Sequence, residues 1–219
     1  MGKFITQFDT TQALDNARVN YSISLPNLSL TKDDNKIHYI KEPQYVDLGL
    51  TSGTLWATMN LGAENEFDNG CYFSWGNLEN SLQKNDSYDF SQENYEYTDG
   101  SSLEGNFEQG NTRYDAARSL WEGTWAIPRV EQFQELLDET IVSPIDGGWR
   151  LTSTNNGKSI IIPDGGVYDG TTLTNYLGYW TNSFYNEENA EVLTKGGDNA
   201  LFVDYLPRYY GCLIRPVKL

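Results

Sequence analysis

Short stretches of alternating apolar and polar residues, interrupted by glycine, recur along most of the chain after residue 44. Alternation of this kind is typical of strands with one buried face, and the glycine-containing segments between them predict turns. A strand pair across residues 51–53 opens the series, and the pattern resumes after Pro144. The predicted strands cover residues 45–50, 55–59, 70–76, 149–153, 159–163, 178–183, 200–203 and 212–217.

Two stretches in the middle of the chain carry apolar residues at helical spacing instead. Residues 114–121 form a short helical pattern, and residues 130–139 form a longer one with a single apolar face behind Pro128. The polar stretch 77–112 is long for a loop, and we expect a surface excursion with little regular structure. Helices followed by a run of strands predict an α+β fold.

The composition of the chain changes near residues 42 and 43. We therefore assign residues 1–42 to an N-terminal attachment segment and residues 43–219 to one domain. The segment has too few apolar residues to be stable alone, although residues 11–18 favour a short helix and residues 28–30 favour a hairpin with 37–39. We expect it to fold against a partner or its own oligomer through apolar side chains, namely Phe4, Ile5, Phe8, Ile37 and Tyr39.

A net charge of −16 narrows the expected partners. A strongly acidic protein repels phosphate backbones and anionic lipid headgroups, so neither nucleic acid nor a membrane surface is expected. No stretch approaches the roughly 20 apolar residues of a membrane-spanning helix. The start of the chain also lacks the features of a signal peptide, so export by that route is not expected.

Several carboxylates lie in polar loops, where their oxygens could bind a calcium ion. No D-x-D-x-D-G pattern joins them, so solvated loop carboxylates are the favoured interpretation, and no other cofactor is expected. The residues concerned are Asp33, Asp34, Asp86 and Asp89.

Groups that could carry catalysis are few. The two cysteines, Cys71 and Cys212, lie far apart in the chain, and we expect free, half-buried thiols rather than a disulfide framework. The single histidine, His38, lies on the polar side of a predicted strand in the attachment segment, so Ser–His and Cys–His mechanisms are not expected. No Asp/Glu pair has a context that marks it for glycoside hydrolysis. The sequence therefore favours a non-enzymatic protein.

A series of motifs runs in order through the domain. Its members are Asp47-Leu48-Gly49-Leu50, Leu55-Trp56-Ala57, Tyr72-Phe73, Trp75-Gly76, Asp115-Ala116-Ala117, Glu135-Leu136-Leu137, Ile161-Ile162-Pro163, Tyr179-Trp180 and Ile214-Arg215-Pro216-Val217. The series resembles a domain family abundant in Bacteroidetes proteins, which is similar to the C-type-lectin-like folds of formylglycine-generating enzymes and of variable receptor-binding proteins. The resemblance implies a C-type-lectin-like fold with two short helices and a twisted, mainly antiparallel sheet. The chain departs from the family at Arg129, where a Thr helix cap is usual, and at Cys212. Neither cysteine matches the enzyme's cysteine positions.

The attachment segment has a resemblance of its own. Phe4-Ile5-Thr6-Gln7-Phe8, the stretch 25–30 and Ile37-His38-Tyr39 are similar to the openings of virion structural proteins of Bacteroides phages. This resemblance implies a capsid or fibre protein as partner, a location on the virion surface, and a homo-oligomer, with a trimer favoured.

The resemblance also implies that binding residues lie in the irregular segments before the last strand. Those segments are rich in tyrosine and in amide side chains, which suit recognition of hydroxyl or peptide groups. Any one of these side chains could instead fill the core. The predicted ligand-binding residues are Tyr168, Asn182, Tyr185, Asn186, Asp204, Tyr205, Arg208 and Tyr210. The tryptophans, in contrast, lie inside apolar motifs and are expected in the core.

These observations lead to one favoured hypothesis, a non-enzymatic surface protein of a phage virion, such as a head fibre, decoration or receptor-binding protein. Its lectin-like domain would bind a host surface glycan or protein. Two alternatives stay open. One is a purely structural capsid decoration protein, and the other is a Bacteroidetes cell-surface adhesin or pilus-tip module.

Overall fold

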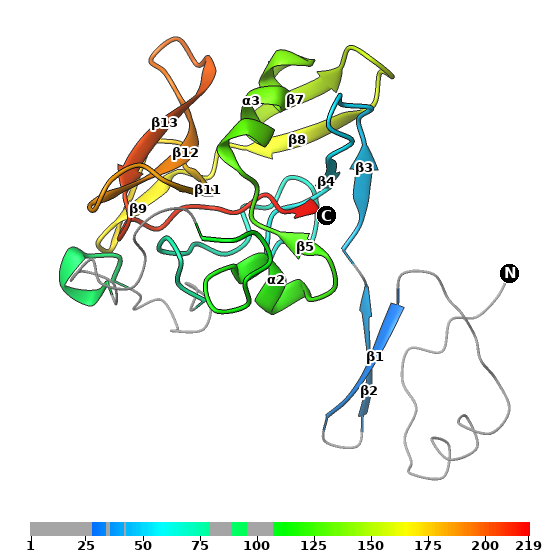
Figure 1. Cartoon of the computed structure of the whole chain (residues 1–219), viewed down its shortest axis with the longest axis horizontal. Helices are drawn as coiled ribbons and strands as arrows, with labels where there is room; N and C mark the ends of the chain where they lie inside the picture. Colours follow the sequence, from blue (N-terminus) through cyan, green and yellow to red (C-terminus); the bar gives the residue numbers. More distant parts are fainter. Residues whose placement is uncertain (1–27, 34–35, 42, 79–88, 96–106) are drawn as a thin grey trace, which may run out of the picture. The chain divides into compact units, whose positions relative to one another are not determined.

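The computed structural model describes residues 28–33, 36–41, 43–78, 89–95 and 107–219, and in the first two ranges it describes the backbone alone. The chain divides into two compact units, residues 1–44 and 45–219 (Figure 1). The predicted domain boundary lies two residues earlier, between residues 42 and 43.

The first unit contains a β-hairpin. Strands β1 (Leu28–Asp33) and β2 (Lys36–Lys41) pair antiparallel, with Leu30 opposite Tyr39. The hairpin predicted here is therefore confirmed. The predicted helix over 11–18 and the apolar residues Phe4, Ile5 and Phe8 lie outside the described residues.

One sheet of the second unit joins the beginning of the unit to its end. It consists of β3 (Tyr45–Asp47), β4 (Leu55–Ala57), β14 (Val217–Lys218) and β5 (Trp125–Ala126), in that order. Val217 faces Trp56 on one side and Ala126 on the other. The last strand therefore lies between strands from the first and middle parts of the unit.

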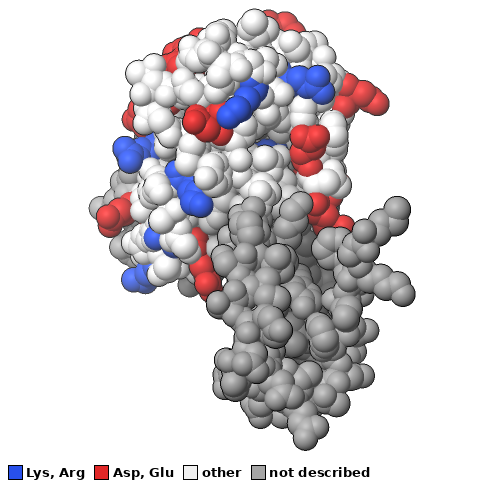
Figure 2. Space-filling view, turned by 90° about the vertical axis from the view of Figure 1, so that its right-hand side faces the viewer, with Lys and Arg blue, Asp and Glu red and all other residues white. Residues whose placement is uncertain are grey.

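Three further antiparallel sheets complete the second unit (Figure 1). They contain β6 (Thr140–Ile145), β7 (Gly148–Ser153) and β8 (Ser159–Pro163); β9 (Val167–Asp169) and β10 (Thr172–Thr174); and β11 (Tyr179–Phe184), β12 (Asn189–Lys195) and β13 (Leu201–Pro207). On the face that carries β3, β7 and β8, basic and acidic side chains are interspersed (Figure 2).

Two α-helices flank β5 in the chain, α2 (Ala116–Trp121) before it and α3 (Val130–Asp138) after it. Both predicted helices are thus confirmed, and the sheet-rich α+β class is observed. A short 3-10 helix, η1, covers Gln92–Asn94. None of the helices in the described part of the chain is long and apolar enough to cross a bilayer.

The start of α3 replaces the expected threonine cap with two other groups. The Arg129 backbone N–H donates to the Gln132 side-chain oxygen at 2.9 Å. The Val130 N–H donates to the hydroxyl of Ser183, on β11, at 3.2 Å. These bonds satisfy the N–H groups of the N-cap residue and of the first helical residue, which are different donors from the one that a threonine side chain at position 129 would accept.

Several predicted elements differ from the observed ones. Residues 70–76 and most of 212–217 are not strands; they meet through an isolated bridge between Phe73 and Cys212. The strands β5, β6, β9, β10 and β12 were not predicted. The described parts of the polar stretch 77–112 also bury three aromatic side chains, Phe90, Tyr95 and Phe107, so this stretch is not only a surface excursion.

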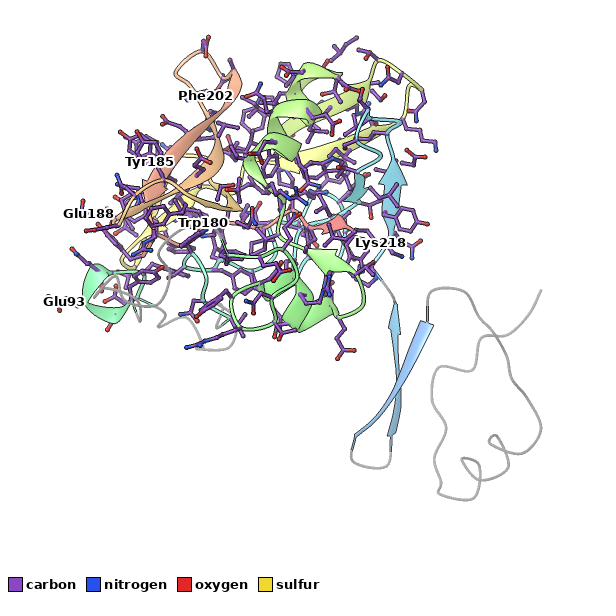
Figure 3. The ribbon with its side chains drawn as sticks, viewed as in Figure 1. Glu93, Trp180, Tyr185, Glu188, Phe202 and Lys218 are labelled. Carbon is purple, nitrogen blue, oxygen red and sulfur yellow. The ribbon has the colours of Figure 1, made fainter. Side chains whose placement is uncertain are left out.

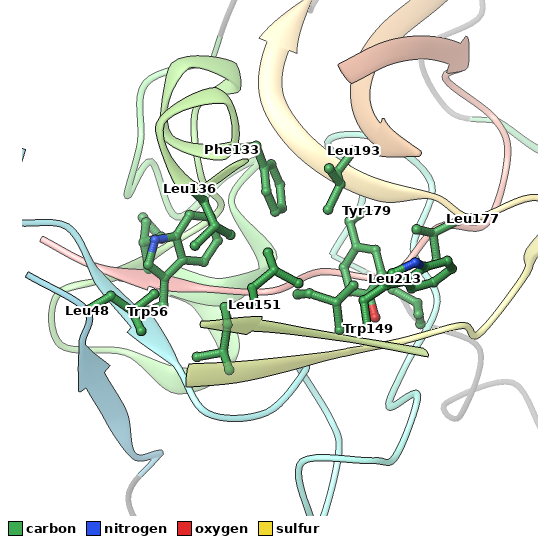
Figure 4. Close-up of a cluster of buried hydrophobic side chains, with 14 of the residues drawn as sticks. Leu48, Trp56, Phe133, Leu136, Trp149, Leu151, Leu177, Tyr179, Leu193 and Leu213 are labelled. Atoms are coloured by element: carbon green, nitrogen blue, oxygen red, sulfur yellow. The ribbon is translucent and has the colours of Figure 1, made fainter. Parts of the chain in front are cut away.

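Buried side chains form two clusters. In the first, Phe133 and Leu136 of α3 face Leu151 of β7, with Trp56 and Tyr179 beside them (Figure 4). The second contains Trp75, Trp180, Phe107 and both cysteines. Five tryptophans are buried as predicted (Trp56, Trp75, Trp125, Trp149 and Trp180), while Trp121 is half-buried against Trp125.

A buried guanidinium group connects the chain end to the rest of the second unit. Arg215 Nε donates to Asn60 Oδ1 at 2.8 Å, Nη1 to the Ala57 carbonyl at 3.0 Å, and Nη2 to the Ile161 carbonyl at 2.6 Å. Asn60 in turn donates to the Tyr179 hydroxyl at 3.0 Å. These bonds bring together four segments that are distant in sequence.

Replacing Arg215 is expected to destabilise the protein strongly. In Arg215→Ala, three buried oxygens lose their donor, so the free energy of unfolding should fall by at least about 3 kcal/mol. Arg215→Lys keeps the charge but not all three bonds and should lose less. Urea denaturation measures both, with the exposed Arg150→Ala as control, expected within about 0.5 kcal/mol of the parent. Equal losses for Arg215→Ala and Arg150→Ala would contradict the role of this network.

Candidate binding site

Two exposed tyrosines stack on each other at one end of the β11–β13 sheet. Tyr185 follows β11 and Tyr205 belongs to β13; their ring centroids are 4.1 Å apart and their planes differ by 10°. The side chains are nevertheless 49% and 44% exposed. Figure 3 shows Tyr185 at the outer end of the sheet, away from the buried Trp180. We call Tyr185 and Tyr205 the tyrosine pair.

The turn after β11 holds Tyr185 in place. Asn186 Oδ1 accepts hydrogen bonds from the backbone N–H groups of Glu188 and Asn189, at 3.0 and 2.8 Å. The N–H of Tyr185 donates to the Asn189 carbonyl at 3.2 Å. Asn186 is exposed, as predicted for a ligand-binding residue, but its carboxamide oxygen is already used as a hydrogen-bond acceptor within the turn.

Asp204 lies next to the pair in sequence but points to the other face of β13, because successive strand residues alternate. It is exposed, and its Oδ1 accepts the backbone N–H of Tyr205 at 2.9 Å. Phe202, two residues before Asp204, is a further exposed aromatic residue on β13 that the sequence interpretation did not include (Figure 3).

Two predicted ligand-binding residues are buried, and these predictions are corrected. Asn182 is 5% exposed and donates from Nδ2 to the Phe107 carbonyl at 2.6 Å. Arg208 is 2% exposed, and its guanidinium lies over the rings of Trp75, Tyr95 and Phe184, at 5.5 to 5.8 Å from their centroids. Both side chains organise the second buried cluster and do not face water.

Tyr168 and Tyr210 are half-buried. The ring of Tyr168 stacks on Phe90, with centroids 5.7 Å apart, and meets Tyr72 edge-on. The Tyr210 hydroxyl donates to Asp169 Oδ2 at 3.1 Å. Burial, with Asp169 beside it, raises the pKa of Tyr210 to about 12, so this phenol stays protonated and donating at neutral pH.

A second tyrosine cluster forms around Asp169. Tyr209 and Tyr210 pack edge to face with centroids 5.0 Å apart. Burial raises the pKa of Tyr209, with further contributions from Asp169 and then Glu188. Glu188 belongs to the turn that carries Tyr185, and its carbonyl accepts the N–H of Arg208 at 2.9 Å. The turn that carries Tyr185 is therefore hydrogen-bonded to the segment that carries Tyr209 and Tyr210.

Of the eight predicted ligand-binding residues, the structure brings together one exposed pair, Tyr185 with Tyr205, and leaves Asn186 and Asp204 exposed nearby.

The predicted docking residues Ile37 and Tyr39 lie on β2, opposite Lys32 and Leu30.

The two thiols do not form a disulfide and lie in the second buried cluster. Burial raises the pKa of Cys71 to about 11 and holds that of Cys212 well above its usual range. The expected half-buried thiols are therefore buried ones. Among the residues whose side chains the structure describes, no three His, Cys, Asp or Glu side chains gather as a metal site; of the calcium candidates, Asp34 and Asp86 lie outside the described residues, and Asp33 is described by its backbone alone.

The thiols are expected to resist thiol–disulfide exchange with an added disulfide reagent in the native protein. With a pKa of about 11 instead of the ordinary 9.0, Cys71 carries roughly a hundredfold less thiolate near pH 8 than an exposed cysteine, and the thiolate is the reactive form. Ellman's reagent should therefore react slowly with native protein and rapidly in urea. Fast reaction of either thiol without denaturant would show that the cluster opens readily.

Comparisons with known proteins give no further guidance: no family model, curated protein or solved structure matches the chain.

Proposed function

We propose that residues 45–219 form a non-enzymatic recognition domain with a C-type-lectin-like fold, displayed on the surface of a phage virion. The domain binds a host surface glycan through the tyrosine pair. The attachment segment anchors it to a capsid or fibre protein, as a homo-oligomer with a trimer favoured.

The exposure of the tyrosine pair carries this proposal. Burying a large apolar side chain contributes about 1.5–3 kcal/mol, so two stacked rings left in water retain apolar area that a ligand can cover. The pair is rigid because the rings support each other and the Asn186 turn holds Tyr185. Rigid tyrosines offer contact area at low entropic cost, and their faces suit the apolar faces of sugar rings.

The architecture is compatible with the proposed fold. The described part of the second unit has two short α-helices and mainly antiparallel sheets, the kinds of element that the resemblance implies. The first and last strands of the unit lie in one sheet. The tyrosine pair is carried by a different sheet, β11–β13.

The absence of a catalytic role is supported by the chemistry of the available groups. The single histidine belongs to the first unit, on β2. The two thiols are buried and have raised pKa values, which favours the unreactive protonated form.

The attachment role is supported by the hairpin of the first unit. An isolated two-stranded hairpin is only marginally stable in water. A partner surface or neighbouring copies of the same segment would supply the buried area that the hairpin lacks.

Removing either tyrosine ring is expected to weaken glycan binding. On an array of host surface polysaccharides, Tyr185→Ala and Tyr205→Ala should each lose at least about tenfold in affinity, equivalent to about 1.4 kcal/mol. Phe67→Ala is the matched control, because Phe67 is 55% exposed and lies on a different loop. If the parent chain binds no host glycan or surface protein, a purely structural decoration is favoured instead.

Immunogold labelling of purified particles tests the location. We expect antibodies against residues 45–219 to label intact virions in a regular pattern, and deletion of residues 1–42 to remove the label. Label on bacterial cells or pili, with unlabelled particles, would favour the adhesin or pilus-tip alternative.

A further inference from the structure

A half-buried carboxylate lies beside the tyrosine pair. Glu191 on β12 is directly opposite Tyr205 on β13, and such antiparallel neighbours project from the same face of a sheet, with Cβ atoms about 4.5–5.5 Å apart. β12 lies between β11 and β13, and Tyr185 follows β11. Because the ring centroids of Tyr185 and Tyr205 are 4.1 Å apart, the stacked rings span β12 on the face that carries Glu191. The pair and this carboxylate therefore belong to one surface.

The negative charge of this surface is not neutralised by the described part of the chain. Burial raises the pKa of Glu191, and the carboxylate of Glu131, exposed in the first turn of α3, raises it further. Among the residues whose side chains the structure describes, neither carboxylate pairs with a cation or accepts a hydrogen bond. Arg129, two residues before Glu131, donates from Nε to Gln109 instead. A carboxylate that has lost part of its hydration without gaining a partner is able to bind a cation.

The rings and the carboxylate attract the same kind of group. The face of a tyrosine ring carries negative partial charge and attracts a cation within about 6 Å of its centroid. A carboxylate forms short, charge-assisted hydrogen bonds with an ammonium group. A neutral sugar could stack on the rings but would leave Glu191 without a counter-charge, and an anionic ligand would be repelled. A cation that also has an apolar ring face uses both parts of the surface.

We propose that the tyrosine pair and Glu191 bind a sugar unit that carries a free amino group in its ammonium form. The apolar face of the pyranose ring stacks on the tyrosines, and the ammonium group donates to the Glu191 carboxylate. Glu131 adds negative potential at this end of the sheet. The assignment deepens the recognition function proposed above: it rests on a surface glycan as the ligand and names the chemistry of one of its units.

Calorimetric titration of the full chain with three small probes tests the ligand class. Methyl glucosaminide, which has a free amino group, should bind saturably. Its N-acetylated form, which has the same ring without the charge, and ethanolamine, which has the charge without the ring, should each bind at least about tenfold more weakly. Binding of methyl glucosaminide should also weaken as salt is raised, because the attraction between ammonium and carboxylate is screened.

Three results of this titration would overturn the proposal. One is equal affinity for the amino and N-acetyl sugars, which would show that the charge is not recognised. Another is ethanolamine binding as tightly as methyl glucosaminide, which would indicate recognition of the charge alone, as on a basic peptide. The third is no saturable binding of methyl glucosaminide up to roughly 50 mM.

Variants test whether Glu191 supplies the selectivity. Glu191→Gln keeps the size of the side chain and removes its charge, so it should fold normally and bind methyl glucosaminide at least about tenfold more weakly. Glu64→Gln is the matched control, because Glu64 is exposed on the loop that carries Phe67 and its replacement changes the net charge equally. Glu64→Gln should bind as the parent does. Equal affinities of the two variants would refute the role of Glu191.

The same variants separate this inference from the recognition function on which it rests. On the array of host surface polysaccharides, both Tyr185→Ala and Glu191→Gln should lose binding. If Tyr185→Ala loses binding and Glu191→Gln keeps it, the recognition function stands and the amino-sugar assignment fails. If both variants bind as the parent does, both proposals fail.

Discussion

The second unit is organised around a positive charge held in its interior. Arg215 is fully buried, and burial lowers its pKa to about 10, which still leaves it protonated at neutral pH. Taking such a charge out of water is costly unless every donor finds an acceptor. Here the acceptors are neutral oxygens from Asn60, Ala57 and Ile161, so charge and geometry are satisfied only when these segments are all in place. The segment around Arg215 can therefore reach its native position only together with the segments that carry Asn60, Ala57 and Ile161.

The position of the tyrosine pair follows from how the β11–β13 sheet is buried. β12 contributes Leu193 to one buried cluster and Val192 to the other, so the middle strand is covered on both faces. Only the outer end of the sheet and the edge strand β13 remain exposed. Apolar residues placed there have no core to enter, which explains why Tyr185 and Tyr205 stack on each other instead.

Periodicity predicted those elements whose burial is one-sided. The helix α3 follows from apolar residues at helical spacing and the strand β7 from alternation, with burial concentrated on one face of each, whereas β8 was recognised from a short apolar run. β6 was missed because Pro144 lies within it, a residue that a sheet accepts at an edge strand such as this one. β12 was missed because a strand covered on both faces loses the alternation on which its recognition depends.

The binding surface was harder to predict because polar residues are not always exposed. Asn182 and Arg208 look like surface residues by type, yet Asn182 satisfies a backbone carbonyl in the interior and Arg208 lies among aromatic rings. Nothing in the local sequence separates them from Asn186, which does reach the surface.

The hydrogen bond between Asp204 and the Tyr205 N–H affects how the exposed edge of the β11–β13 sheet can pair with other molecules. β13 is an edge strand, and exposed edges invite strands of neighbouring molecules to add to the sheet. At Tyr205 the donor that such a strand would need is occupied by a carboxylate, which also repels an equally acidic neighbour. Strand addition is therefore disfavoured at this position of the edge, while the rings of Tyr185 and Tyr205 remain exposed.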